Sequence, residues 1–286
     1  MYGLLSLLPP GISWIVDYRL SMAEVYASNT FELMSWAKSL EPLRLRQARV
    51  VDETLPSWVP DLTAVSPYIN YDLGDESNAF NASAGAAFFA EYARPAELSV
   101  RAYEVDTVSV CHPYALLQSD PKPPPKDPDH DEERYMRRVL RRWRGMAVKH
   151  AKDDRDELAN EIALWQAIAS DKLPANYPSS SDTSDKGNIY VDAEMATGLS
   201  EWLYASDDDT KSRMNARLRA MLRVRIMGNY FFVTANGRMG SCYGGCKVGD
   251  IVYVLAGLSR PVLLRAKEEG DEQGLAFVSA CYCDGR

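Results

Sequence analysis

Hydrophobic and polar positions follow a helical period in some parts of the chain and alternate in others. Residues 21–40 repeat apolar side chains near helical spacing. Ser21 followed by Glu24 is a capping-box pair, in which each side chain accepts a hydrogen bond from the other residue's backbone amide. Pro42 discourages continuation, because the residue before a proline avoids the helical conformation. This pattern predicts one amphipathic helix over 21–40.

Two further segments of the N-terminal part have different patterns. Residues 55–68 contain three prolines, which predict an extended, irregular segment. We expect that segment to pack through Trp58 and Val59. Residues 97–111 alternate in part between apolar and polar side chains, which predicts one or two strands.

The middle of the chain combines loops with helices. Residues 119–130 hold five prolines and predict a polyproline-like linker. Residues 171–188 are rich in Pro, Ser and Asp and predict a second loop. Ser206 and the three aspartates after it predict a helix start, with Leu222 among the buried positions of that helix. Apolar spacing also predicts helices over 131–150, 153–170 and 192–205.

Each of the first two central helices has an apolar stripe that we expect to be buried. The stripe of the first helix consists of Tyr135, Val139, Trp143 and Met146. The stripe of the second consists of Leu158, Ile162, Trp165 and Ile168.

From Tyr230 onward the pattern changes to short strands. Asn236-Gly237 is a tight-turn dipeptide, because both residues tolerate positive φ. Four glycines between 240 and 249 indicate a loop, and Gly249 and Gly257 are expected to permit turns. The strand-like runs lie at 230–234, 251–255, 262–265 and 275–283.

These patterns together predict an α+β protein with three consecutive parts. They are a mixed region over 1–112, a helical region with Pro-rich and Ser/Asp-rich loops over 113–226, and a small antiparallel β-sheet or barrel over 227–286. A chain of 286 residues that is 46% hydrophobic can form a core without disulfides or metals. No apolar run approaches the roughly 20 residues of a membrane span, and no basic leader precedes the first apolar run. We therefore expect a soluble, cytoplasmic protein.

Charge is distributed unevenly along the chain. The formal net charge is −8, yet residues 134–152 hold eight Lys or Arg and no acid, and residues 211–225 hold six and no acid. Arginine pairs well with phosphate, so one hypothesis is that the chain binds nucleic acid or an anionic surface. The favoured interpretation is a solvated helix face whose side-chain stems cover apolar surface, with nearby acids as partners. The possible anion-binding residues are Arg137, Arg138, Arg141 and Arg142.

Candidate chemistry is sparse. The last four of five cysteines have C-x3-C and C-x-C spacing, which a tetrahedral zinc ion could use. The favoured interpretation is free thiols, because alternate residues of a strand point to opposite faces. The three histidines and the glycines match no catalytic or nucleotide-binding motif. We therefore expect no enzyme activity, no cofactor and no metal. The zinc candidates are Cys242, Cys246, Cys281 and Cys283.

Two separate blocks of the sequence each resemble segments of one known protein family. The first block consists of YGLLSLL (2–8), VDY (16–18), AEVY (23–26), LPSWVPD (55–61) and FNASAG (80–85). The second consists of FFVTANGRMG (231–240), VGDIV (248–252), Gly257, PVLLR (261–265), Val278 and YCDG (282–285). Together they resemble the fungal heterokaryon-incompatibility (HET) domain proteins, in which similar segments follow the HET domain in the same order.

The resemblance implies a function, but the two resembling blocks do not include the family's defining module. That module is a TIR-like α/β domain that would precede residue 1, so the chain resembles a truncated downstream region. The resemblance implies a non-enzymatic accessory or recognition region in non-self recognition and programmed cell death, acting through a protein partner that the sequence does not identify. The residues leave two alternatives open, namely binding of nucleic acid or an anionic surface and a zinc-stabilised interaction module.

Overall fold

The computed structural model describes most of the predicted elements. The described residues are 17–46, 54–61, 81–93, 97–113, 128–151, 156–169, 172–173, 189–205, 222–223, 226, 228–267 and 274–284. The helices are α1 (Met22–Ala37), the short 3-10 helix η2 (Glu41–Leu45), α2 (Pro128–His150), α3 (Glu157–Ala169) and α4 (Ala193–Tyr204). The strands are β1 (Ala90–Ala93), β2 (Glu97–Val100), β3 (Ala102–Pro113), β4 (Lys172–Leu173), β5 (Ile189–Tyr190), β6 (Asn229–Thr234), β7 (Met239–Tyr243), β8 (Ile251–Leu255), β9 (Val262–Ala266) and β10 (Leu275–Cys283).

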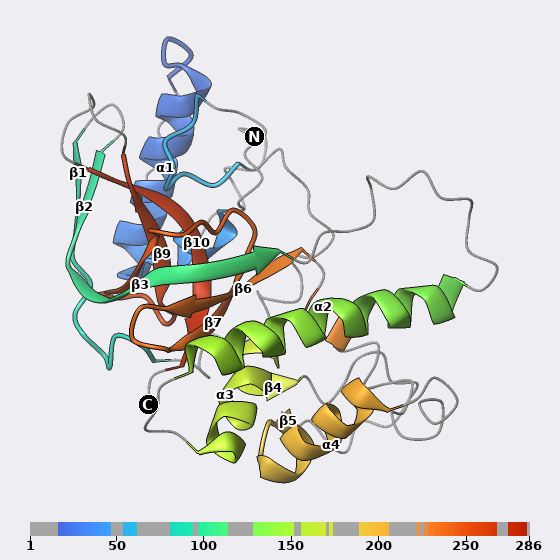
Figure 1. Ribbon diagram of the computed structural model, residues 1–286. Helices are drawn as coiled ribbons and strands as arrows, with labels where there is room; N and C mark the ends of the chain where they lie inside the picture. The colour runs from blue at the N-terminus through green and yellow to red at the C-terminus, as the bar shows by residue number, and fades with distance from the viewer. Residues whose placement is uncertain are drawn as a thin grey trace, which may run out of the picture. The chain divides into compact units, whose positions relative to one another are not determined.

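A closed antiparallel barrel confirms the predicted α+β class (Figure 1). Its strand order is β10-β7-β6-β3-β8-β9. Two separate sheets, β1-β2 and β4-β5, have two strands each. Five of the six barrel strands come from the predicted C-terminal β module. The sixth is β3, where Cys111 pairs with Phe232 and a register shift occurs between Val108 and Val110. The β module therefore closes with a strand from more than a hundred residues earlier in the chain.

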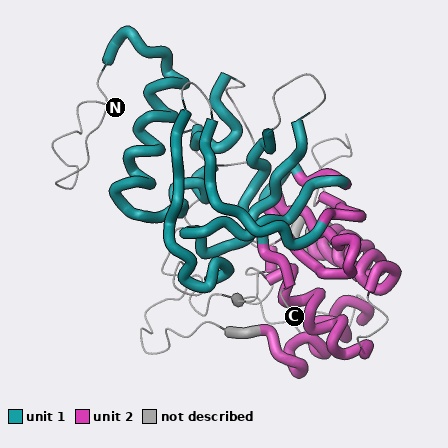
Figure 2. Tube along the Cα trace, turned by 90° about the vertical axis from the view of Figure 1, so that its left-hand side faces the viewer, with its two compact units in different colours: residues 1–106, 243–245, 249–281 teal, residues 107–242, 246–248, 282–286 magenta. Residues whose placement is uncertain are grey.

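The chain divides into two compact units that interleave along the sequence (Figure 2). Unit 1 consists of residues 1–106, 243–245 and 249–281, and unit 2 of residues 107–242, 246–248 and 282–286. The units cut across the three consecutive parts expected from the sequence, whose boundaries stay predictions.

The core of unit 1 is built around α1 and the segment after it. The predicted capping box is present, since the Glu24 amide donates to the Ser21 hydroxyl over 3.3 Å and the Ser21 amide donates to the Glu24 carboxylate over 2.8 Å. The helix ends sooner than predicted, at Ala37, and the capping residue Lys38 has a left-handed φ of 51°. Trp58 and Val59 are buried in the irregular segment as expected. The N-terminal helix and the packing of that segment are thus confirmed.

Gly257 shows why one predicted turn requires glycine. Its φ is 87°, and a Cβ at this position would lie 3.1 Å from the Cα of Phe88. Its carbonyl accepts a hydrogen bond from the Leu40 amide over 2.9 Å. Gly237 and Gly249 also have positive φ, at 73° and 93°, so all three expected turn glycines are confirmed.

The core of unit 2 is formed by the apolar faces of α2, α3 and α4 packed with β6. Three tryptophans, Trp143, Trp165 and Trp202, are each at most 1% exposed. Every member of the two predicted stripes is buried or partly buried except Leu158, which is 48% exposed. The prediction for Leu158 is wrong although Trp165, seven residues later, lies on the same helical face, because Leu158 is in the first turn of α3 and remains exposed there.

Several other predictions need correction. Helix α2 begins at Pro128, inside the predicted linker, because a proline in the first turn lacks only an amide that would have no helical partner there. Strand β7 occupies part of the predicted glycine-rich loop. Its first four positions are all buried, so it shows no alternation for a sequence pattern to detect. Asn236 does not take the positive φ expected of it, since Gly237 alone of that dipeptide does.

Some predicted features lie outside the described residues. These include most of the Pro-rich linker, the Ser/Asp-rich loop, the helix start at Ser206 and most of the basic stretch 211–225. Leu222 is described and is fully buried, as expected.

Candidate functional site

Two arginines of α2 hold the C-terminal end of α4. The Arg137 guanidinium donates to the carbonyl of Ala205 over 3.1 Å, and Arg141 Nε donates to the carbonyl of Leu203 over 2.9 Å. Carbonyls at the end of a helix lack intrahelical partners and form the negative end of its dipole, so cations stabilise them. Arg137 also pairs with Glu133 over 3.3 Å and is 3% exposed. Arg137 is therefore buried and paired inside unit 2, and its suggested role in anion binding stays a prediction.

These two arginines and a third from α2, Arg144, stack on aromatic side chains of α4. The guanidinium of Arg137 lies 5.2 Å from the ring centroid of Trp202. Those of Arg141 and Arg144 lie 5.6 Å and 5.3 Å from the ring centroid of Tyr204. Such distances are within the range of cation–π attraction. Stacking and carbonyl capping together explain why this helix carries arginine rather than lysine at these positions.

A different face of α2 carries exposed cations. Arg138 and Arg142, both predicted anion-binding residues, are exposed, and so is Lys149. Arg142 and Lys149 follow Arg138 by four and eleven residues, which places all three on one side of the helix. Among the described residues, none of the three forms an ion pair. These three side chains form what we call the basic face of α2.

A polar chain links α2, α3 and α4 inside unit 2. Arg144 donates to one oxygen of Glu161, and Ser200 donates to the other over 2.6 Å. Trp165 Nε1 in turn donates to the Ser200 hydroxyl over 2.8 Å. Burial alone would lower the pKa of Arg144, but its hydrogen bonds to Glu161 and Tyr204 outweigh burial and raise that pKa. Arg144 is therefore a permanent cation that holds the facing helices together.

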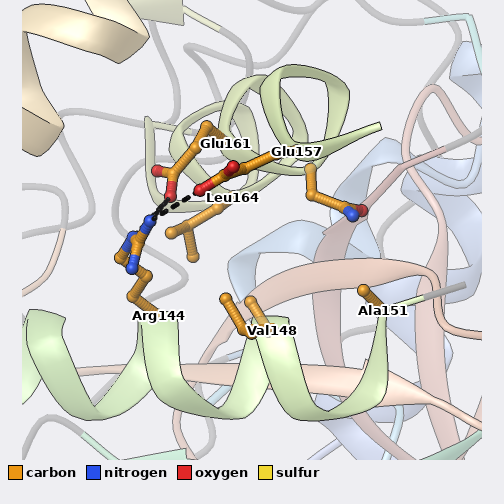
Figure 3. Close-up of a pocket in the computed structure, with 8 residues that line it drawn as sticks. Arg144, Val148, Ala151, Glu157, Glu161 and Leu164 are labelled. Carbon is orange, nitrogen blue, oxygen red and sulfur yellow. Dashed lines mark hydrogen bonds and ion pairs between the residues drawn. The ribbon is translucent and has the colours of Figure 1, made fainter. Parts of the chain in front are cut away.

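This ion pair borders a pocket of about 320 Å³ between α2 and α3. Figure 3 shows Arg144 directed from α2 toward the carboxylates of Glu157 and Glu161 on α3. The distance from Arg144 to Glu157 is 4.0 Å, and the Glu157 side chain is 91% exposed. The polar lining is completed by Asn160. The apolar lining consists of Ala147, Val148, Ala151 and Leu164. We call this concavity the α2–α3 pocket.

His112 is a structural hydrogen-bond acceptor in unit 2. Its Nδ1 accepts from Trp143 Nε1 over 3.2 Å, and Trp143 stacks on Phe231 with ring centroids 5.6 Å apart. Burial, and secondarily the charge of Arg142, lower the pKa of His112. A neutral imidazole is needed here because a protonated Nδ1 could not accept the indole N–H.

The cysteines do not form a metal centre in the described part of the chain. All five are free thiols, and Cys242, Cys246 and Cys281 are buried. No group of three or more His, Cys, Asp or Glu side chains among the described residues is placed to hold a metal ion. The zinc hypothesis therefore lacks the ligand cluster it requires.

Comparison with protein-family models, curated proteins and solved structures found no match for the chain. The HET resemblance therefore rests on the sequence blocks alone. In the described residues, no helix combines the length and the apolar character needed to cross a bilayer.

Sequence reasoning missed the α2–α3 pocket. Glu157 and Glu161 are four residues apart on a helix, which the sequence does show. Their proximity to Arg144 depends on the packing of α3 against α2, which no pattern along the chain reveals. The spacing of these two acids is therefore the signal that the sequence offered.

Proposed function

We propose that the chain is a recognition region that binds a partner protein through the α2–α3 pocket and the side chains near it. This is the kind of role that the resemblance to HET proteins implies. The observation that carries the proposal is the exposure of large apolar side chains on these helices of unit 2. Val148 is 60% exposed, Leu158 is 48% exposed and Tyr204 is 54% exposed.

These side chains are connected to the pocket. Val148 lines it, Leu158 follows the lining residue Glu157, and the Tyr204 hydroxyl accepts from Arg144 over 3.4 Å. Tyrosine and arginine are enriched among the residues that dominate protein–protein binding energies. A concave site flanked by apolar and aromatic side chains, with a charged rim, has the composition of a protein interface.

Site-specific photocrosslinking tests this proposal. A photoreactive amino acid would be placed at Val148 or Leu158 of the full chain in cells, with Tyr103 (74% exposed, unit 1) and Val248 (65% exposed) as control positions. We expect one protein species to crosslink at Val148 and Leu158 and not at the controls. Equal crosslinking at all four positions, or none, would contradict the proposal.

The cell-death role implied by the resemblance has its own test. We expect a HET module joined to this chain to trigger death when expressed, and the chain alone not to. Leu158→Asp in the joined protein should reduce killing, because it places a charge in the interface. Killing by the chain alone would show that the activity lies here rather than in the HET module.

The basic face of α2 supports a second candidate function. Arg138, Arg142 and Lys149 could neutralise phosphates, and such binding weakens steeply with salt. If nucleic acid is the ligand, changing all three to Ala should abolish binding to a 20-nucleotide RNA or DNA at 50 mM salt. Salt-independent binding, or binding that survives the triple change, would exclude this function.

A further inference from the structure

We infer that the α2–α3 pocket takes a lysine or arginine side chain of the partner protein. The inference rests on the proposed function, and it names the chemical group that the partner inserts. It follows from the hydrogen-bonding capacity that remains around the pocket, from one buried oxygen atom and from the apolar walls.

The cation at the pocket is already neutralised. Arg144 Nε and Nη2 both pair with Glu161, Nη1 donates to the Tyr204 hydroxyl, and Nη2 also lies 4.0 Å from Glu157. An incoming carboxylate or phosphate would have to displace one of these groups. An anionic ligand is therefore disfavoured.

The remaining capacity around the pocket belongs to acceptors. Both oxygens of Glu161 are occupied by Arg144 and Ser200. The Glu157 carboxylate is exposed, and its charged partner among the described residues is Arg144 at 4.0 Å. With two carboxylates and one guanidinium on the rim, the polar lining favours a ligand that is positively charged and donates hydrogen bonds.

Asn160 gives independent support. Its Oδ1 atom is buried and has no hydrogen-bond partner among the described residues. Such an oxygen destabilises the folded chain relative to one with a hydrogen-bond donor. Asparagine is also a poor helix former, so Ala at this position would favour α3. Because Asn160 lines the pocket, a residue that is costly on both counts is explained if its amide group turns toward an incoming N–H that satisfies the oxygen.

The apolar walls match the rest of a basic side chain. Ala147, Val148 and Leu164 offer hydrocarbon surface beside the polar rim. Lysine and arginine carry apolar stems that pack on such surface while the charged end binds polar groups. A volume of about 320 Å³ is at the small end of ligand sites, which suits one side chain better than a cofactor.

Saturation-transfer NMR with the full chain tests the inference. The probes are the capped pentapeptides Ala-Ala-X-Ala-Ala with X as lysine, norleucine or glutamate. Norleucine keeps a linear apolar stem and lacks the charge. We expect the lysine peptide to bind at least about tenfold more tightly than either of the others, the ratio expected of one charge-assisted hydrogen bond. Equal affinities, or preference for glutamate, would overturn the inference.

Variants assign the effect to the pocket. Asn160→Ala should weaken binding of the lysine peptide by roughly tenfold without unfolding α3. Glu157→Gln should weaken it by roughly two- to fivefold, since exposed charges contribute less. Glu91→Gln, an exposed acid on β1 that does not line the pocket, is the matched control and should change nothing. Loss of binding in the control but not in Asn160→Ala would place the site elsewhere.

The two proposals fail in different ways. If crosslinking at Val148 and Leu158 succeeds while the lysine peptide shows no preference, the interface stands and the inserted group is not basic. If lysine binds selectively but no protein crosslinks, the pocket binds a cation and the protein partner is excluded.

Discussion

The two units use their paired charged side chains in different ways. In unit 1, Arg265 pairs with buried Asp250 over 2.7 Å and donates to the Gly245 carbonyl over 2.6 Å, so the charges fix a loop before β8. In unit 2, Arg137, Arg141 and Arg144 connect helices to one another and bring Tyr204 beside the rim of the α2–α3 pocket. Charge in unit 1 thus fixes backbone, whereas charge in unit 2 also shapes the surface that we propose as a partner-binding site.

A second example from unit 1 supports the comparison. Glu41 accepts from the Ser259 amide over 2.8 Å and from Arg44 over 2.9 Å. Burial would raise the pKa of Glu41, but the hydrogen bonds from Ser259 and Arg44 prevail and lower it. This carboxylate joins η2 to the turn between β8 and β9 and has no other evident role.

The largest expected effect is on the buried pair of unit 1. Asp250→Asn leaves Arg265 without its counter-ion at a site where Asp250 is 1% exposed. Removing one partner of a fully buried pair costs about 3–5 kcal/mol of unfolding free energy. Because the Arg265 side chain is 32% exposed and stays partly hydrated, we expect a loss of about 3 kcal/mol. Urea denaturation measures this, with the exposed Glu91→Gln as control. A loss below about 1 kcal/mol is what an exposed ion pair contributes. Such a result would contradict the structural role that we assign to the Arg265–Asp250 pair of unit 1.

A smaller effect is expected where α2 caps α4. Arg137→Met keeps much of the buried stem but loses the hydrogen bonds to Ala205 and Glu133, and we expect a loss of about 1.5–3 kcal/mol. Hydrogen exchange of α4 amides should quicken in this variant. Arg138→Met on the exposed face is the matched control and should leave both quantities unchanged. Equal effects of the two changes would mean that Arg137 does not act as a cap.

The smallest effect concerns the pH dependence of unit 2. The folded-state pKa of His112 is lowered, so the unfolded chain binds the proton more readily. Stability from neutral His112 is therefore fully present above the unfolded pKa of about 6.5 and is lost as the pH falls below it. His112→Gln cannot titrate at this position. The difference in unfolding free energy between the natural chain and this variant should shrink from pH 7.5 to pH 5. A constant difference would contradict the assigned acceptor role of His112.

Local sequence signals predicted much of the fold and little of the candidate site. The capping box at Ser21, the stripe around Trp143 and the turn at Gly257 each depend on neighbours in the chain, and each was confirmed. The addition of β3 to the barrel depends on pairing between Cys111 and Phe232, which no local pattern contains.

The candidate site depends even more on tertiary packing. The arginines of α2 were recognised as unusual, but periodicity alone could not separate buried Arg137 from exposed Arg138, one position further along. That distinction comes from the end of α4, which lies more than sixty residues later in the chain. Asn160 gave no signal in the sequence because its importance lies in an unsatisfied oxygen.

The central claim is that unit 2 recognises a basic side chain of a partner in the α2–α3 pocket. Amide chemical-shift mapping with ¹⁵N-labelled full chain and the lysine pentapeptide tests it most directly. We predict saturable shifts confined to residues 144–151, at the end of α2 and just after it, and to residues 157–164 of α3, absent with the norleucine peptide. Shifts centred on any other segment, or identical shifts with norleucine, would contradict the claim.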